Sequence, residues 1–169
     1  LRAVLLLFVC TVTIGLNSAT AQTTPSDRLL VLLRDASALA IIDPANRTIL
    51  GRVETGRDPH EVTASSDGQY AFVTSMVDGI SVIDLAAQQE IRRVNPGNGS
   101  GTHDVVFSDG KLYFTIEGYK SIGRYDPVTD EIEWTLGIGQ EGTHMLVHDA
   151  ATNTMFMPNT GSNTVTMIE

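Results

Sequence analysis

Three passages of this chain repeat one pattern at nearly equal spacing, and each is centred on a histidine. The passages cover residues 56–62, 101–105 and 142–146, and each leads into an apolar stretch. His60 and His103 lie 43 residues apart, and His103 and His144 lie 41 apart. A period in this range is typical of propellers and solenoids, in which each repeat is one supersecondary unit. The repeat therefore constrains the architecture before any other feature.

The rest of each repeat is built from short strand-like runs. A Ser-Asp-Gly turn at 66–68 and 108–110 precedes an aromatic run, and an alternating run that ends on an acid follows. Such runs, bounded by Gly, Asp, Asn and Pro, predict β-strands, and helical periodicity is missing. The predicted strands are innermost at about 60–65, 103–107 and 144–148, second at about 29–34, 70–75, 111–117 and 154–158, third at about 38–43, 79–84, 121–126 and 163–168, and outer at about 48–54, 89–94 and 131–136.

These fourteen strands predict an all-β protein, a β-propeller of four-stranded antiparallel blades. The first unit lacks an innermost strand and the last lacks an outer one, so we expect an incomplete arc of two full and two partial blades. Propellers usually need four to eight blades to close. We therefore expect a fragment of a longer protein. The alternative is an oligomer that assembles a ring from shorter arcs, because exposed strand edges favour pairing.

The N-terminus has the pattern of an export signal. Arg2 precedes an apolar run, and Ala19 and Ala21 form an A-x-A cleavage site. We predict a signal peptide over 1–21, a short linker over 22–27 and a partial propeller domain over 28–169. The alternative is a membrane helix, but the run is short for a span of ~20 residues. Cys10, the only cysteine, lies within the signal, so the expected location is a bacterial periplasm or the extracellular space.

The charge narrows the choice of partners. The net charge is -9, and clusters of Lys and Arg that would contact phosphates are missing. We therefore expect no nucleic acid and no stable membrane span after signal cleavage. The remaining partners are an unknown protein, peptide, glycan or small-molecule ligand.

Two runs of residues carry a family resemblance. Residues 59–75, with Pro59-His60-Glu61-Val62 and a Tyr-Ala-Phe-Val-Thr-Ser strand, resemble the repeats of YVTN-type (YncE-like) β-propellers. Residues 112–127 are similar to the repeats of streptogramin B lyase-like propellers. The resemblance covers about 28–169 and implies the propeller fold. Its departures include Ser66, which stands where the family usually has proline, and the loss of the Asp-Gly turn in the third copy.

The three repeated histidines are the candidate metal site. Each precedes a predicted innermost strand, so His60, His103 and His144 are expected on one rim of the central channel. Neutral imidazoles are common ligands of zinc and copper, which predicts a divalent metal. The structural alternative is that each histidine bonds a neighbouring loop or carboxylate, and a wide channel would hold the rings too far apart to share an ion.

The acidic residues divide into two groups. Five of them are expected to start turns: Asp43, Asp67, Asp84, Asp109 and Asp126. The others are Glu61, Asp104, Glu117 and Glu141. The lyase-like resemblance implies that acids and histidines near the channel mouth hold magnesium and supply a general base, with His103, His144 and either Glu117 or Glu141 as the best match.

Three functions remain open. The first is a ligand- or protein-binding scaffold, which needs no catalytic residue. The second is a metal-dependent enzyme resembling lyase or lactonase propellers. The third is a redox-associated propeller, although no C-x-x-C-H motif for covalent haem attachment is present.

Overall fold

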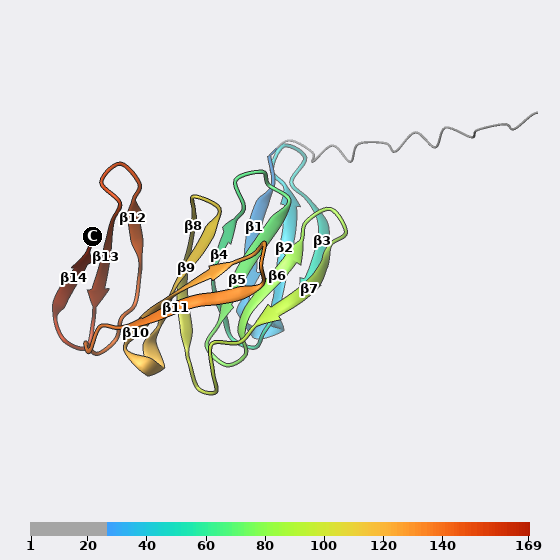
Figure 1. The fold of residues 1–169 in the computed structure, drawn as a ribbon. Helices are drawn as coiled ribbons and strands as arrows, with labels where there is room; N and C mark the ends of the chain where they lie inside the picture. The colour runs from blue at the N-terminus through green and yellow to red at the C-terminus, as the bar shows by residue number, and fades with distance from the viewer. Residues whose placement is uncertain (1–26) are drawn as a thin grey trace, which may run out of the picture.

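The computed structural model describes residues 27–169, so the predicted signal peptide and nearly all of the linker lie outside the described part. Fourteen strands form four separate antiparallel sheets, which follow one another along an arc (Figure 1). The first sheet contains β1 (Leu29–Leu33), β2 (Ala38–Asp43) and β3 (Thr48–Glu54). The second contains β4 (Pro59–Ala64), β5 (Tyr70–Ser75), β6 (Gly79–Asp84) and β7 (Gln89–Val94).

The third sheet contains β8 (Thr102–Ser108), β9 (Lys111–Ile116), β10 (Ser121–Asp126) and β11 (Glu131–Gly137). The last contains β12 (Val147–Asp149), β13 (Thr154–Asn159) and β14 (Thr164–Ile168). Two sheets of four strands and two of three confirm the predicted arc of two full and two partial blades. Among residues 27–169, no helix is long and apolar enough to cross a membrane.

Two details of the predicted elements are wrong. His144 does not enter an innermost strand, because β12 begins three residues later and only an isolated bridge between Thr143 and Asn159 precedes it. Two single 3-10 turns were also missed, η1 (Arg34–Ala36) and η2 (Glu117–Tyr119). Each fills the connection between the second and third strands of its blade. A three-residue turn is too short to leave a periodic signal in the sequence.

The core consists of three apolar layers, one between each pair of neighbouring sheets. Leu39, Ile41, Val73 and Ile83 lie between the first and second sheets. Phe72, Ile80, Leu112 and Phe114 lie between the second and third. Tyr113, Ile122, Leu146 and Met157 lie between the third and fourth. Burying both faces of the inner sheets in this way explains their nearly continuous runs of apolar residues.

One close contact requires a glycine. Gly123 of β10 pairs with Phe114 of β9, and a Cβ added to Gly123 would lie 2.4 Å from the Phe114 ring. The ring therefore packs directly on the backbone of the neighbouring strand. The aromatic side chains of Tyr113, Phe114 and Trp134 pack between blades. Phe156 is an exception, because it is 38% exposed.

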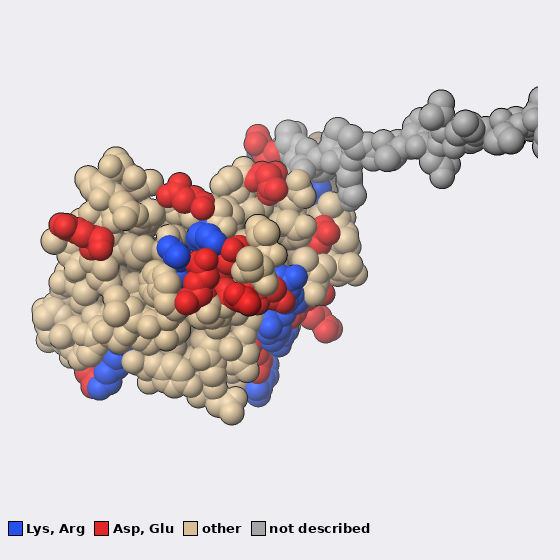
Figure 2. Space-filling view, in the orientation of Figure 1, with Lys and Arg blue, Asp and Glu red and all other residues tan. Residues whose placement is uncertain are grey.

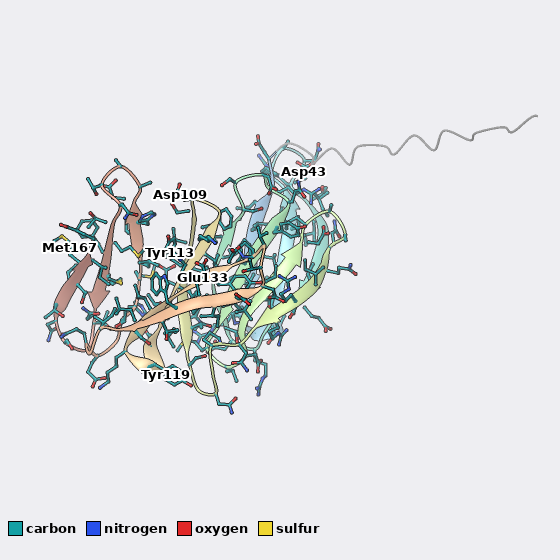
Figure 3. All side chains as sticks on the ribbon, in the orientation of Figure 1. Asp43, Asp109, Tyr113, Tyr119, Glu133 and Met167 are labelled. Atoms are coloured by element: carbon teal, nitrogen blue, oxygen red, sulfur yellow. The ribbon has the colours of Figure 1, made fainter. Side chains whose placement is uncertain are left out.

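Charged side chains gather over β10 and β11 on the face seen in Figure 2. There Lys111 contacts Asp126 and Glu133, and Arg124 also contacts Glu133. Glu133 projects from β11 near the middle of this face (Figure 3). These ion pairs join β9, β10 and β11 to one another on this face.

Candidate functional site at the histidine rim

The three repeated histidines meet at one rim of the arc. The ring centroids of His60 and His103 are 4.6 Å apart, and those of His103 and His144 are 3.8 Å apart. The expectation that a wide channel would separate the rings is therefore wrong. Three consecutive repeats bring their imidazoles into contact.

Two β-bulges aim the first two rings. In the second sheet the register shifts between Pro59 and Val62, and in the third it shifts between Thr102 and Val105. Each bulge leaves the histidine and the residue after it opposite a single residue of the neighbouring strand. A bulge re-aims side chains and increases the local twist. This extra residue is how an innermost strand presents an imidazole at the rim.

The residue opposite each bulge is a fully buried threonine. The Thr74 hydroxyl accepts a hydrogen bond from the Glu61 N–H (3.0 Å) and donates to the His103 carbonyl of the next blade (2.5 Å). The Thr115 hydroxyl accepts from the Asp104 N–H (2.9 Å) and donates to the His144 carbonyl (2.9 Å). Each threonine therefore fastens its own bulge and the histidine of the following blade.

Sequence reasoning missed this threonine pair. The signal was present, since Thr74 and Thr115 occupy the same position of the aromatic strand in two successive repeats. The hydrogen bonds of these threonines depend on a bulge in the opposing strand, and the repeat pattern alone does not reveal that bulge.

The three imidazoles have different environments. His103 is buried, and its Nδ1 has no hydrogen-bond partner within residues 27–169. Burial, followed by the neighbouring His144, lowers the pKa of His103, so its ring is kept neutral. His144 Nδ1 lies 2.6 Å from the Glu117 carboxylate. His60 Nδ1 lies 3.3 Å from the backbone carbonyl of Asp58. The alternative of hydrogen-bonded structural histidines therefore describes His60 and His144 but not His103.

Glu61 and Asp104 occupy equivalent positions, each directly after a histidine, but their roles differ. Asp104 is buried, and its carboxylate accepts hydrogen bonds from the N–H groups of Val105 (2.7 Å) and Leu146. Glu61 is half-buried, and burial together with the charge of Asp104 raises its pKa. Asp104 therefore holds the next blade, whereas Glu61 adds an acid beside the rings.

The remaining predicted acids separate clearly. Glu117, at the start of η2, reaches the rim, whereas Glu141 instead pairs with Lys120 on the surface. Carboxylates at four of the five predicted turn positions accept backbone N–H bonds as expected, those of Asp43, Asp67, Asp84 and Asp126. Asp109 takes a positive φ of 50° in the turn between β8 and β9.

Three donors at the rim are close enough to share one ion. One ligand atom from each of His103, Glu117 and His144 lies within 4.8 Å of the others. His60 is outside this group, although its ring lies against that of His103.

Comparison with known proteins identifies the family. The model of the Cytochrome D1 heme domain matches residues 23–129, which include two of the three rim histidines. The chain belongs to the Cytochrome D1 heme domain family. This family membership places the chain among β-propellers, while the specific YVTN-type resemblance stays a prediction.

The proteins that this chain resembles are longer than the chain itself. Protein NirF of Stutzerimonas stutzeri is 30% identical over 125 residues, a match that covers 71% of this chain and 30% of NirF. Hydrazine synthase of Kuenenia stuttgartiensis has a TM-score of 0.77 at 19% identity, covering 84% of this chain and 42% of that one. Virginiamycin B lyase of Staphylococcus aureus has a TM-score of 0.70 at 17% identity, covering 85% and 52%. The two structures share the propeller fold, and the chain spans about half or less of each protein.

Proposed function

We propose that this chain is part of an exported, ligand-binding β-propeller whose histidine rim binds a haem-type iron tetrapyrrole. The observation that carries this proposal is the contact of three imidazoles from consecutive repeats at one rim. Membership of a family described as a heme domain supports the class of ligand. The predicted signal over 1–21 supports a periplasmic or extracellular location.

The donor set fits such a ligand. Imidazole is a common axial ligand of haem iron. The Nδ1 of His144 faces the Glu117 carboxylate at 2.6 Å, which leaves Nε2 for iron. Histidines that bind metals usually donate their other ring N–H to a carboxylate or carbonyl in this way. His144 would therefore hold the iron, with Glu117 as the group that orients its ring.

The protein and the tetrapyrrole would contribute different things. Bound haem would supply a redox-active iron. The redox-associated propeller considered above is therefore one form of this proposal. The protein supplies an imidazole, the carboxylate that fixes it, and the buried threonine that holds its backbone. With no C-x-x-C-H motif in the sequence, the expected attachment is non-covalent.

A spectroscopic titration tests the proposal. Haem added to the purified chain should give a shifted, saturable Soret band at one haem per chain. His144→Ala should weaken binding by about tenfold or more, because the imidazole that would hold the iron is lost. Glu117→Gln should weaken it less, within the roughly 10- to 100-fold range of groups that support a metal ligand.

His148→Ala is the matched control. His148 is also partly buried, but its ring lies 5.4 Å from Tyr113, between blades. Its replacement should leave the Soret titration unchanged. Equal weakening by His144→Ala and His148→Ala, or an unsaturable titration, would contradict a specific haem site at the rim.

A further inference from the structure

We propose that His103, Glu117 and His144 form a site for a single divalent transition-metal ion, such as Zn²⁺ or Co²⁺, which binds without a tetrapyrrole. The site goes beyond the proposed function, because it needs two donors that haem ligation does not use as ligands. It retains two of the three histidines predicted from the sequence and takes Glu117 in place of His60.

The donor chemistry selects the class of ion. Two imidazoles and one carboxylate suit zinc and its first-row neighbours, whereas calcium and magnesium prefer sets made of oxygen alone. The three ligand atoms lie within 4.8 Å of one another. A modest inward movement of the side chains would bring them to the spacing of a zinc site, in which each ligand is roughly 2.0–2.2 Å from the metal.

His103 is the strongest single indication of a missing ligand. It is only 7% exposed, and its Nδ1 has no hydrogen-bond partner within the described part of the chain. The Nδ1 of His148 has none either, but among the described residues only His103 also lies beside two further donors that could share an ion. Buried polar atoms without a partner are uncommon in folded proteins and call for an explanation such as a bound ion or water.

Backbone contacts hold all three donors in place. The carbonyls of His103 and His144 are fixed by buried threonine hydroxyls from the preceding blades. The backbone N–H of Glu117 donates to the Gly101 carbonyl at 3.0 Å, and that of Gly118 donates to the Ser100 carbonyl at 2.9 Å. The turn that carries the carboxylate is therefore tied to the start of the strand that carries His103. A site held in this way loses little freedom when it binds an ion.

The surrounding charge also favours a cation. Glu61 and Asp104 directly follow His60 and His103 in the chain, and their carboxylates add negative charge beside the rim. Both Asp104 oxygens accept backbone N–H bonds, so Asp104 contributes charge rather than a ligand. His60 is turned toward the Asp58 carbonyl and stands outside the donor group.

The arrangement leaves room on the metal for another ligand. Three protein donors with a fourth position open to solvent are typical of catalytic rather than structural zinc sites. The side chains of His144 and Glu117 are 37% and 23% exposed, so the ion would face solvent on their side. Water or an anionic ligand is the expected fourth partner.

The experiment uses the whole 169-residue chain, freed of haem and treated with a chelator. Titration with Co²⁺ should give the visible absorption of a tetrahedral site, and Zn²⁺ should displace the Co²⁺ at one ion per chain. Glu117→Gln and His144→Ala should each weaken Co²⁺ binding by about tenfold or more. His103→Ala should do the same, and the partly exposed Glu117→Gln tests the site if this buried variant fails to fold.

His60→Ala distinguishes the inferred set from three histidines. It should bind Co²⁺ nearly as well as the unmodified chain, as should the control His148→Ala. A loss with His60→Ala equal to that with Glu117→Gln would overturn the assignment. Co²⁺ titration without visible absorbance or saturation would overturn the site itself.

The metal and haem tests can fail separately. A chain that binds haem but not Co²⁺ or Zn²⁺ would refute the metal site and leave the proposed function standing. A chain that binds one Zn²⁺ but no haem would do the reverse.

Discussion

Asp126 closes β10 with a carboxylate that contacts both the backbone and a lysine. One oxygen accepts from the Val128 N–H at 2.8 Å, and the other accepts from the Lys111 ammonium at 2.6 Å. These two hydrogen bonds, first that from Lys111, lower the pKa of Asp126 from 3.8 to about 2. A carboxyl with a lowered pKa stabilises the folded state above its unfolded pKa and loses that contribution as the pH falls through its folded value.

Asp126→Asn should therefore lower stability at pH 7 and reduce the loss of stability between about pH 4 and pH 2. Urea denaturation at several pH values measures both effects. Asp35→Asn, which removes the same charge from an exposed position, is the control and should change neither. Parallel pH profiles for Asp126→Asn and the unmodified chain would contradict this role.

Individual residues were predictable where their role is local. The turn aspartates follow from the affinity of a short carboxylate for the N–H groups two residues on, so their sequence context suffices. The contact between His103 and His144 was not predictable, because it depends on the bulge that aims His103 and on how closely two blades pack. The sequence offered Glu117 and Glu141 as alternatives for the acid at the rim. The choice between them depends on the short turn η2, which carries Glu117 and leaves no periodic signal in the sequence.

At the level of elements, the bulge and its opposing threonine form one repeated device. Thr115→Val keeps the shape of the side chain but leaves the Asp104 N–H and the His144 carbonyl without this partner. We expect a loss of about 1–3 kcal/mol for each group left unsatisfied. The free energy of unfolding, measured with urea, tests the expectation.

Thr115→Ser is the matched variant for that measurement. It keeps the hydroxyl and removes only a methyl group, so it should be more stable than Thr115→Val. Equal destabilisation by the two substitutions would assign the effect to packing rather than to the hydrogen bonds.

Strand positions were predictable to within one or two residues in thirteen of the fourteen strands, because alternation and turn residues recur in every copy. The exception is β12, which is three residues long. There the repeat pattern continues through His144 while the backbone pairs only at Thr143 and again from Val147. The apolar pattern of a sequence indicates which side chains are buried, not which backbone groups pair. Leu146 is buried here although the hydrogen-bonded pairing of its strand is interrupted.

At the scale of the whole molecule, the last sheet has an apolar face in contact with solvent. Val147, Phe156 and Met167 are cross-strand neighbours, and they are 61%, 38% and 58% exposed. Figure 3 shows Met167 on β14, at the end of the arc farthest from the first sheet. Apolar patches of this kind commonly mark surfaces that associate.

Expressed as this 169-residue polypeptide, the chain should therefore self-associate as its concentration rises, and Val147→Lys with Met167→Glu should reduce that association. Light scattering over a range of concentrations measures the effect. Val128→Lys is the control, since Val128 is 89% exposed but lies in a turn of the third sheet. A reduction of equal size from Val128→Lys would show that charge alone, rather than this face, governs association.

The threonine hydroxyls have a consequence for how such a protein can grow. Thr74 and Thr115 each reach forward to the histidine carbonyl of the next blade. A genetic duplication of one repeat would therefore carry with it both an imidazole and the means to seat the imidazole that follows. The rim could lengthen by whole units, each new histidine arriving with a hydroxyl already placed to bind its carbonyl.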